Sequence, residues 1–168
     1  MNYIHRSIEN IIDTLIKRTP AVLLYGQRMS GKTAVLNNCQ SLSGYSYKDL
    51  HELSERAAAA DDPKAYIEAL KKPAIIDNIQ YVPELIYHIS VYVKAHKTNG
   101  LFMLSSSLTP EYLMQAAELS GSVQSDRTKD RQTSYISTVH GSNNSYGNEH
   151  SYAAFTFTDA ACADGCNT

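Results

Sequence analysis

Tryptophan is absent from the 168 residues, and no apolar run approaches the roughly 18 residues of a membrane span. Excess charge is also lacking, because 15 Lys and Arg stand against 17 Asp and Glu, for a net charge of −2. This balance gives no evidence for direct nucleic-acid binding or for attraction to an anionic membrane. The polar start, MNYIHRSIEN, lacks the charged and then apolar plan of a secretory signal. We therefore expect a soluble, cytoplasmic protein that makes no membrane contact.

Cysteine is scarce as well. The three cysteines, Cys39, Cys162 and Cys166, are odd in number and badly spaced for a disulfide framework, which fits a reducing compartment. The sequence offers Cys39 no histidine partner, so we interpret it as a packed side chain rather than a nucleophile.

Apolar residues are distributed unevenly along the chain. All 14 leucines and all 5 prolines lie before residue 120. Among the 46 residues from 123 to 168, 19 are Ser, Thr, Asn or Gly, and only 5 are Leu, Ile, Val or Phe. Such a segment buries too little apolar surface to offset the entropy lost on ordering. The composition predicts a folded domain over residues 1–122 and a disordered C-terminal tail over residues 123–168.

Within residues 1–122, helical and strand patterns alternate. Isoleucines and a leucine between positions 8 and 16 form one apolar stripe of a helix that Pro20 prevents from continuing. The run AVLLY at 21–25 is wholly apolar, as in a strand covered on both faces. Strands are expected at 21–25, 45–47, 74–76 and 101–104, and further helices at 31–38, 52–60, 63–70, from 83 onward and at 110–119. This alternation predicts an α/β fold with a parallel sheet between two helical layers, a three-layer sandwich.

The end of the first strand carries the most informative motif. It fits the P-loop (Walker A) pattern G-x-x-x-x-G-K-[ST], in which backbone N–H groups wrap around a phosphate chain. Lys32 would reach the β- and γ-phosphates, and the Thr33 hydroxyl would bind Mg²⁺. The residues of the motif are Gly26, Gln27, Arg28, Met29, Ser30, Gly31, Lys32 and Thr33. The pattern predicts a site for a nucleotide and Mg²⁺.

A metal in such a site usually needs a second anchor at the end of a neighbouring buried strand. Asp77 follows the apolar run AII at 74–76, so its carboxylate should emerge at the carboxyl edge of the sheet, beside the loop. Two interpretations stay open: Asp77 holds the metal, directly or through water, or it caps the turn that follows.

Together these residues resemble a known group. The chain looks like the N-terminal ATPase domain of a prokaryotic AAA-type family of ATP-binding proteins, whose longer members carry a C-terminal domain of unknown function. The resemblance covers residues 3 to about 122. It is carried by the segments 3–6 (YIHR), 26–28 (GQR), 77–85 (DNIQYVPEL) and 101–107 (LFMLSSS).

The resemblance implies a strand order of 5-1-4-3-2, and the fifth strand has no obvious counterpart after Ser122. An unpaired strand at a sheet edge exposes N–H and C=O groups, so it must be covered or it invites association. Two β-prone stretches, 135–139 and 152–158, could dock there. The second stretch is longer, but its alternation is poor for a strand covered on both faces, so the sequence favours an exposed edge or one covered by a second copy or another protein partner.

Three positions depart from the family pattern. The family has Glu after the strand-ending Asp, where it would polarise the attacking water; this chain has Asn78. The family has Leu-Thr-Gly-Ser after the fourth strand, and this chain has Leu-Ser-Ser-Ser at 104–107. Ser105 and Ser107 keep hydroxyl groups there. An arginine of the family is replaced by Ser122. An amide cannot accept a proton as a carboxylate does, so we expect hydrolysis to be weak.

Two functions therefore remain from sequence. The first is an Mg-ATP hydrolase in which Lys32 and Thr33 bind phosphates and metal, Asp77 holds the metal, Asn78 orients the water, and Ser105 or Ser107 positions it. The second is a nucleotide-binding interaction module without effective turnover, or a non-functional truncated fragment of a larger ATPase. A small-molecule kinase is less favoured, because no arginine-rich lid follows the fourth strand.

Overall fold

Six strands form one sheet at the centre of the computed structural model, which describes residues 3, 5–119, 139–141 and 152–157. Along the sheet the order is β2-β3-β4-β1-β6-β5. The strands are β1 (Ala21–Gly26), β2 (Ser46–Asp49), β3 (Ala74–Asp77), β4 (Phe102–Ser106), β5 (Val139–Gly141) and β6 (Tyr152–Phe157). The helices are α1 (Ser7–Arg18), α2 (Lys32–Asn38), α3 (Leu53–Asp61), α4 (Pro63–Ala69), α5 (Leu85–His96) and α6 (Pro110–Leu119), with 3-10 turns η1 (Gln40–Leu42) and η2 (Ile79–Tyr81).

The first four strands are parallel to one another. Their order, 2-3-4-1, is the predicted 1-4-3-2 arrangement viewed from the other edge. In a parallel sheet all carboxyl ends lie at the same edge, so β1, β3 and β4 end side by side at Gly26, Asp77 and Ser106. The predicted α/β fold with a P-loop NTPase-like sheet is confirmed.

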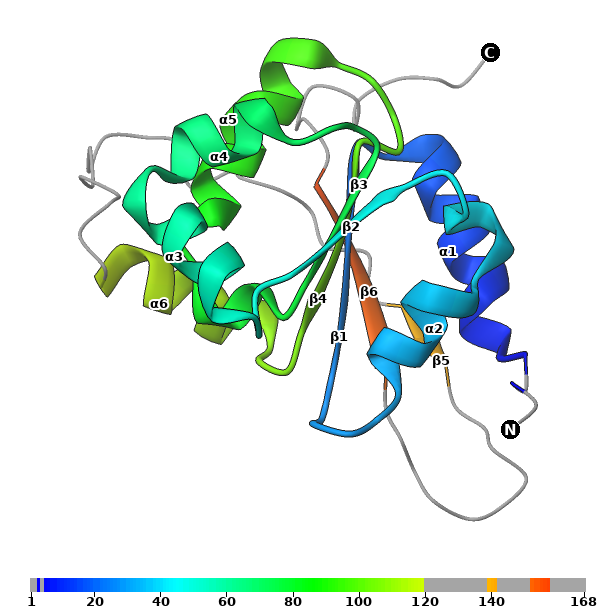
Figure 1. The fold of residues 1–168 in the computed structure, drawn as a ribbon. Helices are drawn as coiled ribbons and strands as arrows, with labels where there is room; N and C mark the ends of the chain where they lie inside the picture. Colours follow the sequence, from blue (N-terminus) through cyan, green and yellow to red (C-terminus); the bar gives the residue numbers. More distant parts are fainter. Residues whose placement is uncertain (1–2, 4, 120–138, 142–151, 158–168) are drawn as a thin grey trace.

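Helices cover both faces of the sheet, as Figure 1 shows: α1 and α2 lie on one side, and α3 to α6 lie on the other. Strand β1 serves both cores. Ala21 and Leu23 are buried in the core under α3–α6, whereas Val22 and Leu24 are buried in the core under α1 and α2. This double covering explains why the sequence of β1 is apolar at every position rather than at every second one.

Helix α1 forms where the isoleucine stripe predicted it. Ile8, Ile12 and Ile16 are buried against the sheet, and each such side chain contributes about 1.5–3 kcal/mol relative to exposure. The helix ends when the backbone N–H of Thr19 bonds to the carbonyl of Leu15, directly before Pro20. Cys39 is buried in the same core and is a free thiol, as its interpretation as a packed residue predicted.

The prediction for the outer edge of β1 was wrong. Strand β6 pairs with β1 in antiparallel register, from Ala21 opposite Phe157 to Gly26 opposite Tyr152, and β5 pairs antiparallel with β6. The edge is thus covered by the chain itself, and no second copy or partner is needed there. Of the tail that composition predicted to be disordered, residues 139–141 and 152–157 form these two strands. Unpaired backbone groups along β1 favour any β-prone segment that can pair, even one with imperfect alternation.

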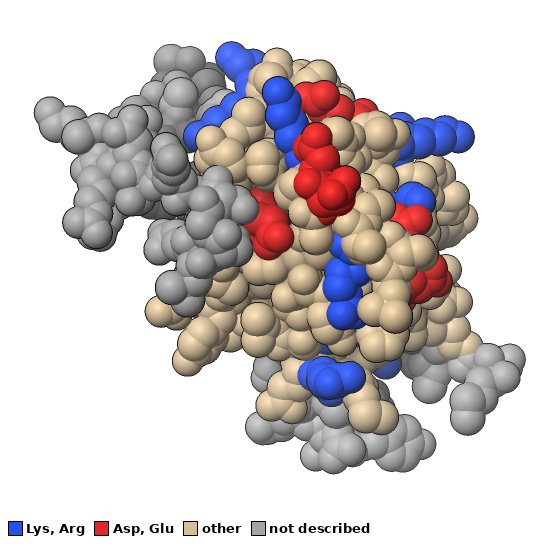
Figure 2. Space-filling view, turned by 60° about the vertical axis from the view of Figure 1, so that its left-hand side comes forward, with Lys and Arg blue, Asp and Glu red and all other residues tan. Residues whose placement is uncertain are grey.

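The remainder of the expected tail, 123–138, 142–151 and 158–168, lies outside the described residues, and with it most of the stretch 135–139. Residues 120–122, which include Ser122, also lie outside them. None of the helices in the described part of the chain has the length and apolar character needed to cross a membrane. On the face drawn in Figure 2, basic and acidic side chains are interspersed rather than gathered into a field of one sign.

Deleting residues 142–168 removes β6 and leaves one edge of β1 without a partner. We expect amide hydrogen exchange in Ala21–Gly26 to accelerate at least about tenfold, since the ladder bonds that protect these amides are lost. Exchange read by mass spectrometry or NMR measures the change. Deleting only residues 158–168 keeps β6 and is the matched control, with unchanged exchange expected. Equal protection of β1 in both deletions would contradict the pairing.

Candidate functional site

The predicted phosphate-binding loop runs from the end of β1 to the start of α2. The N–H of Ser30 bonds to the carbonyl of Gln27 at 3.2 Å, which closes the turn. Met29 has φ 62° and Gly31 has φ 90°, so the backbone is left-handed at two positions. Glycine adopts this conformation without strain, whereas Met29 does so at a fully exposed position at the tip. The loop is therefore folded back so that its chain surrounds the Lys32 ammonium.

Lys32 lies inside this loop. Its Nζ donates to the carbonyl oxygens of Gly26 at 2.7 Å and Gln27 at 2.8 Å, and the residue is only 7% exposed. Burial lowers the pKa of the ammonium below its ordinary value, and the carboxylate of Asp77 opposes that shift. A buried cation held by carbonyl dipoles is positioned to attract an anion into the loop.

Asp77 is the most enclosed charged group of the site, at 1% exposed. Oδ2 accepts hydrogen bonds from the hydroxyls of Thr33 and Tyr47, each at 2.7 Å. Oδ1 accepts from the backbone N–H of Asn78 at 3.0 Å and from the hydroxyl of Ser105. Four donors thus compensate the burial of one carboxylate. Through these hydrogen bonds Asp77 connects the end of the loop with three strands of the sheet.

Tyr47 in β2 was not singled out from the sequence. Burial raises the pKa of its phenol above the ordinary value, and the hydrogen bond to the Asp77 carboxylate raises it further. The hydroxyl therefore stays protonated and donates at any pH of interest. A signal existed, since β2 is parallel to β3 and its last residues had to reach the same edge.

Asn78 sits at the centre of a second hydrogen-bond chain. Its Nδ2 donates to Asp49 Oδ1 at 2.9 Å, and its Oδ1 accepts from Gln80 Nε2 at 3.1 Å. The oxygen of Gln80 in turn accepts from the backbone N–H of Ser107 at 3.2 Å. The nitrogen and the oxygen of the Asn78 amide thus both have hydrogen-bond partners. This series of hydrogen bonds links β2, the end of β3 and the residue after β4.

The backbone of Asn78 is left-handed, with φ 61°. Asparagine tolerates this region better than glutamate does, because its short polar side chain can bond locally. Asparagine at position 78 therefore carries less backbone strain at this turn than the glutamate implied by the resemblance would.

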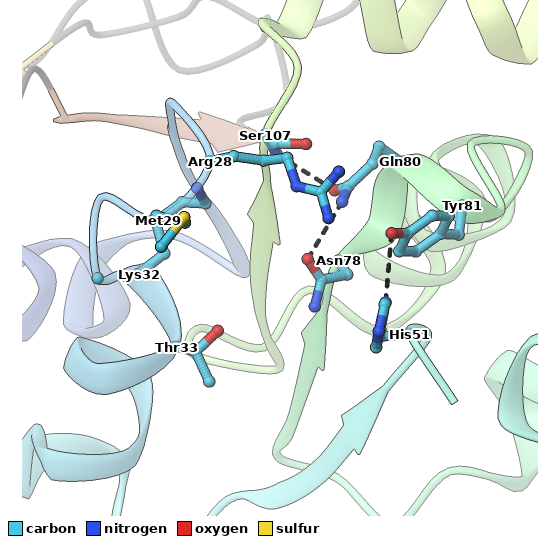
Figure 3. Close-up of a pocket in the computed structure, with 10 residues that line it drawn as sticks. Arg28, Met29, Lys32, Thr33, His51, Asn78, Gln80, Tyr81 and Ser107 are labelled. Carbon is cyan, nitrogen blue, oxygen red and sulfur yellow. Dashed lines mark hydrogen bonds between the residues drawn. The ribbon is translucent and has the colours of Figure 1, made fainter. Parts of the chain in front are cut away.

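A cavity of about 590 Å³ opens between the loop and the ends of β3 and β4 (Figure 3). Figure 3 shows Arg28 reaching from the loop into this space, on the side of Gln80. His51 and Tyr81 form the far wall, where the ring nitrogen Nδ1 and the hydroxyl are 3.2 Å apart. The lining residues are Arg28, Met29, Gly31, Lys32, Thr33, His51, Asn78, Gln80, Tyr81 and Ser107.

The predicted site residues divide into two groups. Five of the loop residues, together with Asn78 and Ser107, line the cavity. Ser105 lies behind it, fully buried against Asp77, so the two candidate serines have different surroundings. Gly26 and Ser30 are buried in the loop, and Gln27 contributes its carbonyl to Lys32. The cavity residues missed from sequence are His51, Gln80 and Tyr81; Asp49 was missed behind them.

Thr33, which lines the cavity, and the buried Asp77 next to it offer oxygen ligands that suit a small divalent cation. The Thr33 hydroxyl and the Asp77 carboxylate are hard oxygen ligands 2.7 Å apart, the kind that Mg²⁺ combines with waters and substrate phosphates. Within the described ranges, no cluster of three or more His, Cys, Asp or Glu side chains could hold a metal by itself. The two residues fit a magnesium ion that shares its coordination with a phosphate.

This fold and this loop define a nucleotide-binding domain of the P-loop type. A family model described as "AAA domain" matches residues 18–145, and the chain belongs to that family. The match extends beyond residue 122, where the resemblance drawn from the sequence stopped, and includes β5. Comparisons with curated proteins and with solved structures gave no significant match. The domain is therefore of the nucleotide-binding, ATPase type.

Tyr47→Phe removes one of the four donors to the buried Asp77 carboxylate and leaves the ring in place. We expect the free energy of unfolding to fall by about 1.5–3 kcal/mol, since a charged acceptor loses one hydrogen bond. Urea unfolding measures it. Tyr112→Phe, at an exposed position of α6, makes the same chemical change and should have no effect. Equal stability of the two variants would show that the Tyr47 hydroxyl does not support Asp77.

Proposed function

We propose that this domain binds Mg-ATP in the cavity between residues 26–33 and the ends of β3 and β4, and that it hydrolyses the nucleotide slowly. One observation carries the proposal: the Thr33 hydroxyl and the Asp77 carboxylate, from distant parts of the chain, meet at 2.7 Å below a loop that encloses Lys32. The family supports a nucleotide as the ligand. ATP, magnesium and the individual roles below are our assignments.

The phosphates would bind at the loop. Backbone N–H groups of a P-loop surround the phosphate chain, and the Lys32 ammonium, already desolvated, contributes a full charge at short range. Arg28, which lines the cavity, adds a second cation on the side that faces Gln80. The cavity volume, about 590 Å³, suits a ligand of nucleotide size.

Magnesium would be held by Thr33 directly and by Asp77 directly or through water. When bound, it neutralises charge on the phosphate oxygens and stabilises the charge that develops during phosphoryl transfer. The Thr33 hydroxyl must turn its proton away from the metal, so its bond to Asp77 orients it correctly. Tyr47 and Ser105 act behind the metal, because their hydroxyls fix the orientation of the Asp77 carboxylate.

Slow hydrolysis follows from the residues around the expected water. Asn78 and Ser107 line the cavity, where they would orient a water molecule beside the γ-phosphate. Neither can take its proton at neutral pH, and the loss of a general base lowers rates by typically 10²–10⁴. We assign water positioning to Ser107 rather than to Ser105, because the hydroxyl of Ser105 already donates to the Asp77 carboxylate.

A binding module without turnover is the second candidate. The observation in its favour is that both ends of the Asn78 amide already bond to Asp49 and Gln80. An amide fixed in this way stabilises the turn after β3 rather than serving a reaction. In this case the bound nucleotide would act as a ligand that orders a surface to which another molecule binds.

Mg-ATP should raise the melting temperature, because the proposed site exists only in the folded state. At a ligand concentration 100 times Kd the gain is about 2.7 kcal/mol, which corresponds to about 5–10 °C for a chain of this size. Differential scanning fluorimetry with and without Mg²⁺ measures the shift. Lys32→Ala should abolish it, whereas Lys17→Ala, an exposed cation of α1, should preserve it. No shift in the unaltered protein would refute nucleotide binding.

Asn78→Glu should raise the rate of phosphate release at least about tenfold, since it supplies a carboxylate that can accept the water's proton. Asp49 lies 2.9 Å from the Asn78 amide nitrogen, so the new charge meets a like charge there. Adding Asp49→Asn removes this repulsion and should raise the rate further.

Asn78→Gln is the matched control for that experiment, because it has the length of glutamate without the charge, and its rate should stay at the basal level. Melting with Mg-ATP confirms binding in every variant. If nucleotide binding is intact and the glutamate variants are no faster than Asn78→Gln, the second candidate is favoured and position 78 does not limit turnover.

A further inference from the structure

Arg6, at the N-terminal end of α1, lies against the outer side of the phosphate-binding loop. Its Nη1 donates to the carbonyl oxygen of Ser30 at 2.9 Å. A Cβ placed on Gly31 would lie 2.8 Å from Nη2 and 3.0 Å from Nη1, so the guanidinium is seated directly on the glycine backbone. Residues 6 and 30 are far apart in sequence, and only the packing of α1 on the sheet brings them together.

A set of contacts around Glu9 holds Arg6 in place. One oxygen of the Glu9 carboxylate accepts from the backbone N–H of Arg6 at 2.7 Å and from the hydroxyl of Tyr3 at 2.8 Å. The other oxygen lies 3.0 Å from Nδ1 of His5. Burial acts to raise the pKa of Glu9, but the hydrogen bonds from Arg6, His5 and Tyr3 lower it on balance, so the carboxylate stays charged. Ile8 and Ile12 anchor the same turns in the core.

The contact with Ser30 fixes the direction of one peptide group. The peptide between Ser30 and Gly31 is trans and planar, so its C=O and N–H point in opposite directions. The carbonyl points outward to Arg6, and the N–H of Gly31 therefore points the other way, toward the cavity that Gly31 lines. Turned over, this peptide would present a carbonyl oxygen to the ligand, which repels an anion.

We infer that Arg6 is a positioning residue for the phosphate-binding loop: it holds the Ser30–Gly31 peptide with its N–H toward the bound phosphates. The inference rests on the proposed function. Lys32 and Arg6 then act on opposite sides of the loop, the first from within and the second from outside. The planar fork of an arginine suits this task, since it bonds the carbonyl and packs flat on the glycine at once, which a lysine cannot reproduce.

The test is the dissociation constant of Mg-ATP, measured by isothermal titration calorimetry on the full chain at fixed salt. Arg6→Ala should raise Kd about tenfold or more, in line with the loss of a hydrogen bond from a charged donor. Arg18→Ala removes the same charge from the exposed far end of α1 and should leave Kd unchanged. Arg6→Lys should recover only part of the affinity, because it restores the charge without the fork.

Each other result overturns the inference. If Arg6→Ala lowers the melting temperature of the ligand-free protein but its folded form keeps the original Kd, Arg6 is merely structural. If Arg6→Lys restores Kd in full, only the charge matters. Should Arg6→Ala fail to fold, Arg6→Lys decides, with an unchanged Kd counting against positioning. Binding by the unaltered protein and by Arg6→Ala with equal affinity refutes this inference alone, whereas no binding by the unaltered protein refutes the proposed function as well.

Discussion

A carboxylate that is almost wholly buried must be surrounded by donors, and much of the candidate site is organised by that requirement at Asp77. Its carboxylate accepts hydrogen bonds from the hydroxyls of Thr33, Tyr47 and Ser105 and from the backbone N–H of Asn78. They come from α2, β2, β4 and the turn after β3, so one group connects the phosphate-binding loop to three strands. Within the described residues, no buried side-chain nitrogen or oxygen lacks a partner.

The loop itself is held from several sides. Strand β1, which leads into it, is buried on both faces and paired along both edges, so the position of its end at Gly26 is held by both neighbouring strands. Lys32 bonds to the loop carbonyls from inside, and Arg6 bonds to the Ser30 carbonyl from outside. A loop fixed in this way is preorganised, so little conformational entropy would be lost on binding the anion that we propose for it.

Much of this was predictable because it depends on local patterns. The P-loop spacing at 26–33, Asp77 at the end of an apolar strand, and the alternation of helices and strands each follow from periodicity and turn chemistry. Tyr47, Asp49 and Gln80 escaped prediction, since each acts through a partner that is distant in sequence. Composition did not predict the strands at 139–141 and 152–157, because it measures apolar content and not whether another strand has an unpaired edge.

The sequence by itself determined the class of the fold, the position of the loop for which we propose phosphate binding, and the absence of a glutamate at position 78. Only the tertiary structure decided which strand covers the edge of β1, what occupies both ends of the Asn78 amide, and that Arg6 lies on Gly31. The physical reason is the range of the interactions. Helix periodicity and turns act over a few residues, whereas strand pairing and buried hydrogen bonds join positions whose proximity exists only once the layers have packed.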